Sequence, residues 1–501
     1  MEGNKGLNGL SEHLLLEIVS KLPLKTAMAT AVLSRRWRWL WTHLTDIDID
    51  ITSYPTYTHP NSLGNLRSLV QNVLPKLTSS PFIRNLSFHL RYDGFQNIRR
   101  MTSKGEEKYN TDNIVSWYDW ASRHKNHLRK LRVLLDPNGP GMFWDTPLWI
   151  FEASCLEVLE INPWRLRFGD DHDKYRNSSF HLPNLKKVCV KLDSRNPWIL
   201  EKLVSSSPSL EVFSCQIYLP YCTWNENPTI VNLSNRNLKR LEMECSEPIH
   251  VVINAPKLEY LSFHANKHNN YETLSYKISF VDSPTALLTC SISPWTDHQG
   301  RDIFLPSNLF SVISGVSSLT TADQNPTPFI ASTITFRCLT HLRFLVRRDL
   351  NEAEDMEGLG LLQQCPILEV LTLDLSEYLQ RKKHKWSLPD SKPQCLVTHV
   401  KRIEILAHPF IVGLEDMLLH LLNYLLGNAG VLELLKITII PPRRDVTGYS
   451  SARYYEIQLI KEVFKVPRCS PQSQVEFYSP DRSVLGEGGI DFAPSITSLL
   501  L

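Results

Sequence analysis

Two histidines and a glutamate have a spacing that suits a metal ion. His264, His268 and Glu272 lie four residues apart, and on a helix this spacing would align two imidazoles and a carboxylate for zinc. Their segment, HANKHNNYE, is rich in asparagine and follows an expected strand, which indicates a turn. It also lacks the HExxH order that supplies a general base. The sequence therefore favours a solvated loop, and we expect neither a metal site nor a cofactor.

Nucleophilic catalysis has no support in the sequence. No GxSxG motif occurs, and Cys189, Cys215 and Cys245 fall at expected strand positions, where small buried side chains are the usual explanation. The ten cysteines include no CxxC pair, which favours a reducing compartment. We therefore expect no catalytic residue. An enzyme would require a clustered nucleophile, base or metal that the sequence does not show.

Charge and hydropathy limit the classes of partner and the compartments that we expect for this protein. The 54 Lys and Arg against 52 Asp and Glu leave a formal charge of +2, so no overall field favours nucleic acid. No run of about 18 apolar residues and no signal peptide is apparent, so we expect neither membrane insertion nor secretion. The basic run at 381–385, RKKHK, is either a nuclear import signal or, as we favour, a solvated loop. We expect residence in the nucleus or the cytoplasm.

Aromatic residues form one candidate target-binding cluster. Tyr218, Tyr221 and Trp224 lie in IYLPYCTWNENP, directly after an expected strand. Aromatic side chains in such loops can anchor a partner. Packing against the neighbouring repeat is the alternative that we favour.

A six-residue pattern with apolar residues at positions 1, 4 and 6 recurs along the chain. Its copies are IRNLSF at Ile83, LRKLRV at Leu128, LEVLEI at Leu156, LKKVCV at Leu185, LEVFSC at Leu210, LKRLEM at Leu238, LEYLSF at Leu258, LTHLRF at Leu339, LEVLTL at Leu368, VKRIEI at Val400 and LELLKI at Leu432, with weaker copies LLTCSI at Leu287 and VSSLTT at Val316. From Leu128 onward the copies recur every 20 to 32 residues, a period near that of leucine-rich repeats. The alternation within each copy predicts a strand with one buried face.

Short helical patterns such as WILEKLVSSS at 198–207 and GLGLLQQC at 358–365 lie between these strands. Strands and helices that alternate in this way predict an α/β solenoid, a curved array in which each repeat packs on its neighbours. A doubly wound parallel sheet is the alternative, but the glycine-rich turn that it would normally show is absent.

Two amphipathic helices are expected at the N-terminus, between Leu10 and Trp41. Pro23 divides the segment because proline interrupts a helical hydrogen-bond ladder. The apolar stripes are Leu14, Leu15, Ile18 and Leu22 in the first piece and Leu33, Trp37, Leu40 and Trp41 in the second. So small a segment cannot bury all of this surface by itself. It either caps the following domain or binds another protein.

The same segment resembles an F-box of the plant type, the module by which substrate receptors dock onto a Skp-family adaptor of cullin–RING ubiquitin ligases. The resemblance rests on Leu10, Leu14, Leu15, Ile18, Leu22, Pro23, Val32, Leu33, Ser34, Arg36, Trp37, Leu40 and Trp41. It implies a three-helix module whose adaptor-facing residues are Leu10, Leu14, Ile18, Leu22, Pro23 and Val32. We expect Trp37, Leu40 and Trp41 to pack inside the module or against the next domain instead.

One position departs from the F-box pattern. Ser11 stands where the family usually has proline, and we expect this serine to cap the first helix. Adaptor affinity is the property that the change leaves open, because the proline ring would have added apolar contact.

A second resemblance covers the C-terminal part. The segment WSLPDSKPQCL, the expected helix DMLLHLLNYLLGNAG and the strand VLELLKITI resemble the FBD region that follows the repeats in many plant-type F-box proteins. The expected domains are an F-box at 4–50, leucine-rich repeats at 51–380, an FBD-like cap at 381–460 and an irregular tail at 461–501. We expect the helix after Gly413 to be largely buried and to stop at Gly427-Asn428.

The family resemblance implies a non-catalytic substrate receptor of a Skp–cullin–F-box ubiquitin ligase. The F-box would dock the adaptor, and through it the cullin–RING scaffold, while the repeats would hold an unidentified protein target. The alternative is a non-degradative scaffold or competitor that binds the adaptor weakly. Periodicity alone predicts only a solenoid with an apolar N-terminal appendage.

Overall fold

The computed structural model of the protein describes residues 6–50, 69–77, 82–90, 116–135, 146–166, 172–193, 198–218, 229–245, 249–265, 277–292, 307–322, 334–345, 358–375, 388–389, 391–407, 414–439, 460–478 and 496–497. The chain forms two compact units. The first comprises residues 1–247 with 253–256, and the second comprises 248–252 with 257–501.

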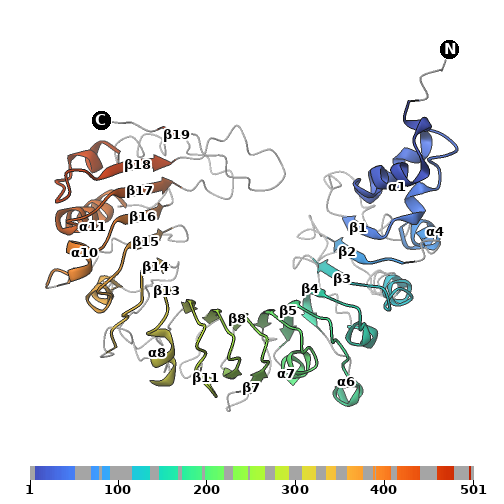
Figure 1. Ribbon diagram of the computed structural model, residues 1–501, viewed down its shortest axis with the longest axis horizontal. Helices are drawn as coiled ribbons and strands as arrows, with labels where there is room; N and C mark the ends of the chain where they lie inside the picture. The colour runs from blue at the N-terminus through green and yellow to red at the C-terminus, as the bar shows by residue number, and fades with distance from the viewer. Residues whose placement is uncertain are drawn as a thin grey trace, which may run out of the picture. The chain divides into compact units, whose positions relative to one another are not determined.

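Parallel strands form the sheet of the first unit (Figure 1). They are β1 (Asp46–Asp50), β2 (Asn85–Leu90), β3 (Lys130–Leu135), β4 (Val158–Leu166), β5 (Lys187–Asp193), β6 (Val212–Tyr218) and β8 (Arg240–Cys245). Each strand pairs in parallel with the next of this series. The fourth positions of the sequence pattern are in register, so that Leu131, Leu159 and Val188 pair in turn and all three are buried.

The second unit repeats this arrangement. Its parallel strands are β10 (Tyr260–Ala265), β12 (Thr289–Ile292), β13 (Ser318–Ala322), β14 (His341–Leu345), β15 (Val370–Leu375), β16 (Arg402–Ala407), β17 (Leu434–Ile439) and β18 (Gln474–Tyr478). The short β19 (Ile496–Thr497) adds antiparallel to β18. Three further strands, β7 (Thr229–Ser234), β9 (Ile249–Asn254) and β11 (Lys277–Phe280), lie outside the parallel series of the two units.

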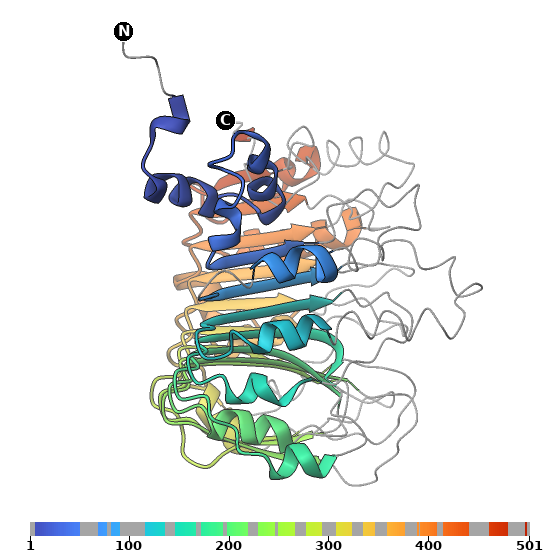
Figure 2. The same cartoon turned by 90° about the vertical axis from the view of Figure 1, so that its right-hand side faces the viewer.

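Helices and helical turns cover one face of the strands in each unit (Figures 1 and 2). They are the π-helical η4 (Leu69–Val73), α4 (Leu74–Leu77), the 3₁₀ turn η6 (Leu148–Glu152), α6 (His172–Asn177), α7 (Trp198–Ser205), α8 (Ser307–Ile313), the 3₁₀ turn η7 (Gly358–Gln364), α10 (Gln394–Thr398) and α11 (Leu414–Asn428). The core lies between these helices and the alternate strand side chains that point toward them. We call the opposite face of the strands the open face.

Every predicted copy of the six-residue pattern coincides with a strand. Within each unit the strands follow chain order without reversal, which is the order of a solenoid and not of a doubly wound sheet. The sequence prediction missed β1 although LTDIDI carries the pattern at Leu44, Ile47 and Ile49, all of them buried. The helical segment expected at 358–365 is the 3₁₀ turn η7, which buries Leu359, Leu361 and Leu362.

The C-terminal part differs from the expectation in one respect. Strands β16 and β17 continue the parallel ladder from β15, and β18 extends it into the segment expected to be an irregular tail. Helix α11 ends at Asn428 as predicted. It buries a stripe that includes Leu418, Leu421 and Leu425, while His420 is exposed. The boundary of an FBD-like cap therefore stays a prediction.

Candidate functional site

The first F-box helix begins at a serine cap. Ser11 has the extended backbone of an N-cap, with φ −65° and ψ 157°, and its hydroxyl accepts a hydrogen bond from the Leu14 amide at 3.4 Å. This confirms the predicted cap, so helix initiation survives the absence of proline. Helix α1 (Glu12–Ser20) buries Leu15 and Val19 completely.

The second half of the module is compact but less helical than expected. It consists of α2 (Leu24–Ala29), the 3₁₀ turn η2 (Thr30–Val32), hydrogen-bonded turns and the 3₁₀ turn η3 (Leu40–His43). The predicted helix from Leu33 to Trp41 is thus wrong, because Leu33 is exposed and does not share a buried stripe with Trp37. Trp37, Leu40 and Trp41 are buried, and η3 contacts α1 and α2 within the module and α4 beyond it. The burial of these three side chains agrees with the prediction that they pack inside the module or against the next domain.

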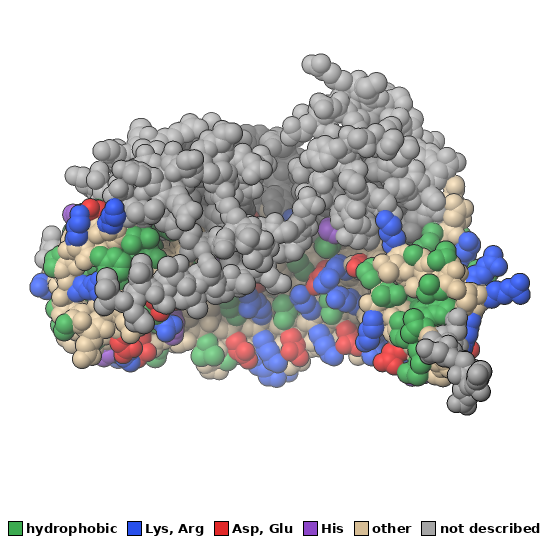
Figure 3. Space-filling view, turned by 90° about the horizontal axis from the view of Figure 1, so that it is seen from above, with side chains coloured by type: hydrophobic (Ala, Val, Ile, Leu, Met, Phe, Trp, Pro, Cys, Tyr) green, Lys and Arg blue, Asp and Glu red, His purple; other side chains and the backbone are tan. Residues whose placement is uncertain are grey.

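The F-box leaves large apolar side chains in contact with solvent. Leu14 is 44% exposed, Ile18 36% and Val32 86%, and the i, i+4 spacing places the first two on one face of α1. Pro23 is exposed, while Leu10 and Leu22 are half-buried. Apolar side chains (green) gather at the right-hand end of Figure 3, where the F-box elements lie. An exposed apolar patch of this kind is typical of a protein interface.

The sequence pattern did not identify every exposed apolar residue of the module. Leu33 and Trp39 are 56% and 54% exposed, and the Arg38 guanidinium lies 5.8 Å from the centre of the Trp39 ring. The helical stripe that the sequence suggested assigned Leu33 to the buried side. The adaptor-facing assignment of Leu10, Leu14, Ile18, Leu22, Pro23 and Val32 remains a prediction.

A leading row of residues stands directly before the strands of the first unit. Its members are Thr45, Arg84, Arg129, Glu157, Lys186, Glu211 and Lys239. Each carbonyl of this row from Thr45 to Glu211 accepts two amide hydrogen bonds from the next repeat; the Arg129 oxygen, for example, accepts from Glu157 at 2.7 Å and Val158 at 3.0 Å. This repeated backbone contact fixes the stagger between repeats.

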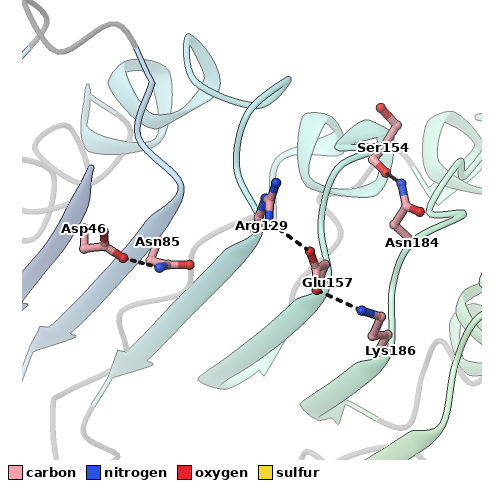
Figure 4. Close-up of polar contacts among 7 residues, drawn as sticks. All are labelled: Asp46, Asn85, Arg129, Ser154, Glu157, Asn184 and Lys186. Atoms are coloured by element: carbon pink, nitrogen blue, oxygen red, sulfur yellow. Dashed lines mark hydrogen bonds and ion pairs between the residues drawn. The ribbon is translucent and has the colours of Figure 1, made fainter. Parts of the chain in front are cut away.

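Charges alternate along the leading row from Arg129 to Lys239. Glu157 lies 3.8 Å from Arg129 and 3.0 Å from Lys186 (Figure 4), and Glu211 lies 3.0 Å from Lys239. Figure 3 likewise shows blue and red side chains intermingled along the lower edge of the view. Because these pairs are half-exposed, each contributes little stability. From Arg129 to Lys239 the row holds three cations and two carboxylates, so most of its charge is neutralised within the row.

The open face of the first unit carries a shared carboxylate. Glu160 on β4 accepts hydrogen bonds from Arg132 on β3 and from Lys187 on β5, the latter at 2.9 Å. Desolvation raises the pKa of Glu160, but the hydrogen bonds and charges of Arg132 and Lys187 outweigh it and hold the pKa below its ordinary value. Glu160 is therefore a charged structural bridge.

The open face of the second unit carries polar side chains that contact one another across neighbouring strands. His264 Nε2 lies 3.2 Å from the Ser291 hydroxyl, and Arg343 pairs with the buried Asp374. The Lys436 ammonium lies 4.7 Å from the centre of the Tyr478 ring. These contacts join neighbouring strands, so much of this polar surface is occupied within the protein.

Several predicted features lie outside the described residues. Tyr218 ends β6, but its side chain, Tyr221 and Trp224 are not described, and neither are His268, Glu272 and the basic run at 381–385. The target-binding role of the aromatic cluster is thus untested. Across the described ranges, no group of three or more His, Cys, Asp or Glu side chains could hold a metal ion.

Most cysteines of the described strands and helices are buried. Cys215 and Cys245 are buried, as predicted, but the prediction was wrong for Cys189, which points to the open face of the sheet and is exposed. Burial raises the pKa of the Cys215 thiol well above its ordinary range and that of Cys395 to about 11. A thiol with so high a pKa is a poor nucleophile at neutral pH. None of the helices described combines the length and apolarity that a bilayer span requires.

Comparisons with known proteins agree with this architecture. A family model of the F-box domain matches residues 7–44. One F-box/FBD/LRR-repeat protein of Arabidopsis thaliana is 25% identical over 491 residues, covering 94% of this chain and 96% of its own length. A second is 24% identical over 488 residues, with 94% and 95% coverage. The chain thus carries an N-terminal F-box and is homologous over most of its length to the F-box/FBD/LRR-repeat proteins.

Proposed function

We propose that this protein is the substrate-receptor subunit of a Skp–cullin–F-box ubiquitin ligase. The observation that carries the proposal is the set of exposed apolar side chains on the F-box, Leu14, Ile18 and Val32 above all. F-box domains generally dock Skp-type adaptors, and these side chains supply the apolar anchors that such docking requires. Through the adaptor the protein would join a cullin–RING scaffold, while its repeats hold a protein target.

The proposed mechanism is proximity. The receptor forms no bond itself, because holding a target lysine beside a ubiquitin-loaded conjugating enzyme raises the effective concentration of the two reactants. No side chain of the receptor then needs to act as nucleophile or base. Two compact units built from stacked parallel strands offer an extended surface for such holding.

The alternative is a scaffold or competitor that binds the adaptor weakly. Its only specific support is Ser11, which removes a proline ring from the expected interface. The structure shows that Ser11 still caps α1, so the change does not disrupt the helix. We therefore favour the receptor.

Assembly on size-exclusion chromatography tests the proposal. The full chain, a purified Skp-family adaptor and a cullin are mixed, and we expect the three to elute together. Ile18→Asp should abolish co-elution because it places a charge in the apolar contact. Val431→Asp is the matched control, since Val431 is a comparably exposed valine, 41%, in the second unit. Co-elution that persists with Ile18→Asp, or that fails for the unaltered chain, would contradict the receptor model.

A further inference from the structure

A row of basic and aliphatic side chains crosses the open face of the first unit. The register pairs Lys130 on β3 with Val158 on β4, then Lys187 on β5, Val212 on β6 and Arg240 on β8. Each of these residues is the first of its strand. Cations and valines therefore alternate strand by strand, and we call these five residues the basic row.

The basic row differs in charge from its neighbours. It contains no acidic residue, whereas the leading row alternates between Arg or Lys and Glu. Lys130 has no ion-pair partner within the described ranges. The side chains of Lys187 and Arg240 are 46% and 44% exposed. A ligand that reaches this row meets three cations with a common spacing.

The partners of Lys187 and Arg240 neutralise only part of this charge. Lys187 pairs with Glu160, but Glu160 also holds Arg132, so its carboxylate stays neutralised if Lys187 turns to a ligand. Arg240 pairs with Glu242 on its own strand at 2.6 Å. The four cations Arg132, Lys130, Lys187 and Arg240 outnumber the two carboxylates Glu160 and Glu242, so this set of side chains keeps a net positive charge, which complements an acidic partner.

The spacing of the cations favours one backbone conformation for a peptide that binds along the basic row. Neighbouring strands lie about 4.8 Å apart, so cations on alternate strands lie roughly 9.6 Å apart. A polyproline II helix has three residues per turn and advances about 9.3 Å per turn, so every third residue faces the same side. An extended β-strand instead presents a side chain to one face about every 6.7 Å, which does not match.

We propose that the basic row binds an acidic peptide in the polyproline II conformation that carries an anionic side chain at every third residue. The three anions pair with Lys130, Lys187 and Arg240 in turn. Val158 and Val212, both half-buried, lie between the cations, where proline rings of the peptide can pack. The proposal rests on the proposed receptor function and names the chemistry of the segment that a target presents.

Fluorescence anisotropy with the full chain tests this proposal. The probe is a labelled peptide of three Asp-Pro-Pro repeats, and the control peptide has the same composition with its three aspartates adjacent. At low ionic strength, where surface charges are least screened, we expect the spaced peptide to bind roughly tenfold more tightly. A third peptide with phosphoserine in place of aspartate shows whether the anion is a carboxylate or a phosphate. Equal affinity for the spaced and clustered peptides, or no binding of any peptide, would overturn the proposal.

Substitutions locate the binding site. Lys130→Gln, Lys187→Gln and Arg240→Gln should each weaken binding of the spaced peptide roughly two- to fivefold, the range of single exposed ion pairs. Lys401→Gln is the matched control and should leave binding unchanged, because Lys401 is likewise half-exposed and ion-paired, to Glu369 at 3.4 Å, but lies in the second unit. An equal loss with Lys401→Gln would show nonspecific attraction and overturn the assignment.

Adaptor binding separates the two proposals. All four glutamine variants should bind a Skp-family adaptor as the unaltered chain does, which also shows that they are folded. Adaptor binding without peptide binding would refute the basic row and leave the receptor function intact. Peptide binding without adaptor binding would refute the receptor function alone.

Discussion

Asn235 ties helix α7 to the turn that leads into β8, and replacing it should loosen this part of the first unit. The side chain is buried. Its amide donates hydrogen bonds to the carbonyl oxygens of Val204 at 3.1 Å and Ser207 at 2.8 Å, and its oxygen accepts one from the Asn237 amide at 2.9 Å. Asn235→Leu keeps the branching at Cγ with a larger side chain, but it can form none of these bonds.

The expected loss is about 2 kcal/mol in the free energy of opening this region. Three neutral hydrogen bonds contribute about 1 kcal/mol each. Leucine regains part of this by burying apolar surface, and the two carbonyls keep other partners, the amides of Ser207 at 3.4 Å and Leu210 at 3.0 Å. At about 1.4 kcal/mol per factor of ten, the opening equilibrium rises roughly 30-fold.

Hydrogen–deuterium exchange measures this change in peptides that span α7 and β8. We expect amide exchange there to accelerate roughly 30-fold in Asn235→Leu, with the second unit unaffected. Ser207→Ala is the control, because the buried Ser207 hydroxyl has no hydrogen-bond partner among the residues that the structure describes, so its loss removes no bond seen there. Less than threefold acceleration in Asn235→Leu, or equal acceleration in Ser207→Ala, would refute the reasoning.

Four further substitutions test the packing and the charges. Gly430→Ala should lower the urea midpoint of unfolding, because a Cβ there would lie 2.6 Å from the Val397 carbonyl oxygen. Gly427→Ala should raise this midpoint, because open space surrounds its Cβ and alanine favours the helix. A higher midpoint for Gly430→Ala than for Gly427→Ala would contradict the packing around the end of α11. Lys202→Met should lower the free energy of opening of α6 by about 2 kcal/mol, because the Lys202 ammonium donates hydrogen bonds to the carbonyls of Tyr175, Arg176 and Ser178. Hydrogen exchange of the α6 amides measures this change. Unchanged exchange would show that these bonds contribute nothing. Glu160 has a lowered pKa, so it stabilises the fold above its ordinary pKa and this contribution is lost as the pH falls through its folded pKa. Glu160→Gln should therefore be less stable than the parent at pH 7, the two converging in acid; a pH-independent difference in thermal unfolding would exclude this linkage.

The repeat architecture could be predicted because the buried face of each strand corresponds to a short apolar pattern in the sequence. Residues at positions 4 and 6 face the helices, as Leu131 and Val133 do, and their apolar character is visible without any structure. The sequence prediction missed β18 because Gln472 occupies the first position of the six-residue pattern, which is apolar in the other copies. It missed β7, β9 and β11 because these strands lie outside the leucine-rich pattern.

The candidate surfaces were harder to predict than the core. The burial of Trp37, Leu40 and Trp41 was predicted from the sequence, but the exposure of Leu33 and Trp39 depends on turns that replace the expected helix. The basic row is present in the sequence at the third position of each copy. It could be recognised as a row only from the strand register, which makes these residues neighbours on adjacent strands.

The central claim is that the F-box binds a Skp-family adaptor, and calorimetric titration of the adaptor into the full chain tests it most directly. We predict saturable one-to-one binding that weakens at least about 30-fold in the double variant Leu22→Ala, Pro23→Ala, since apolar anchors contribute about 2 kcal/mol or more each. Circular dichroism confirms that this variant is folded. No binding by the unaltered chain, or equal binding by the folded double variant, would contradict the account.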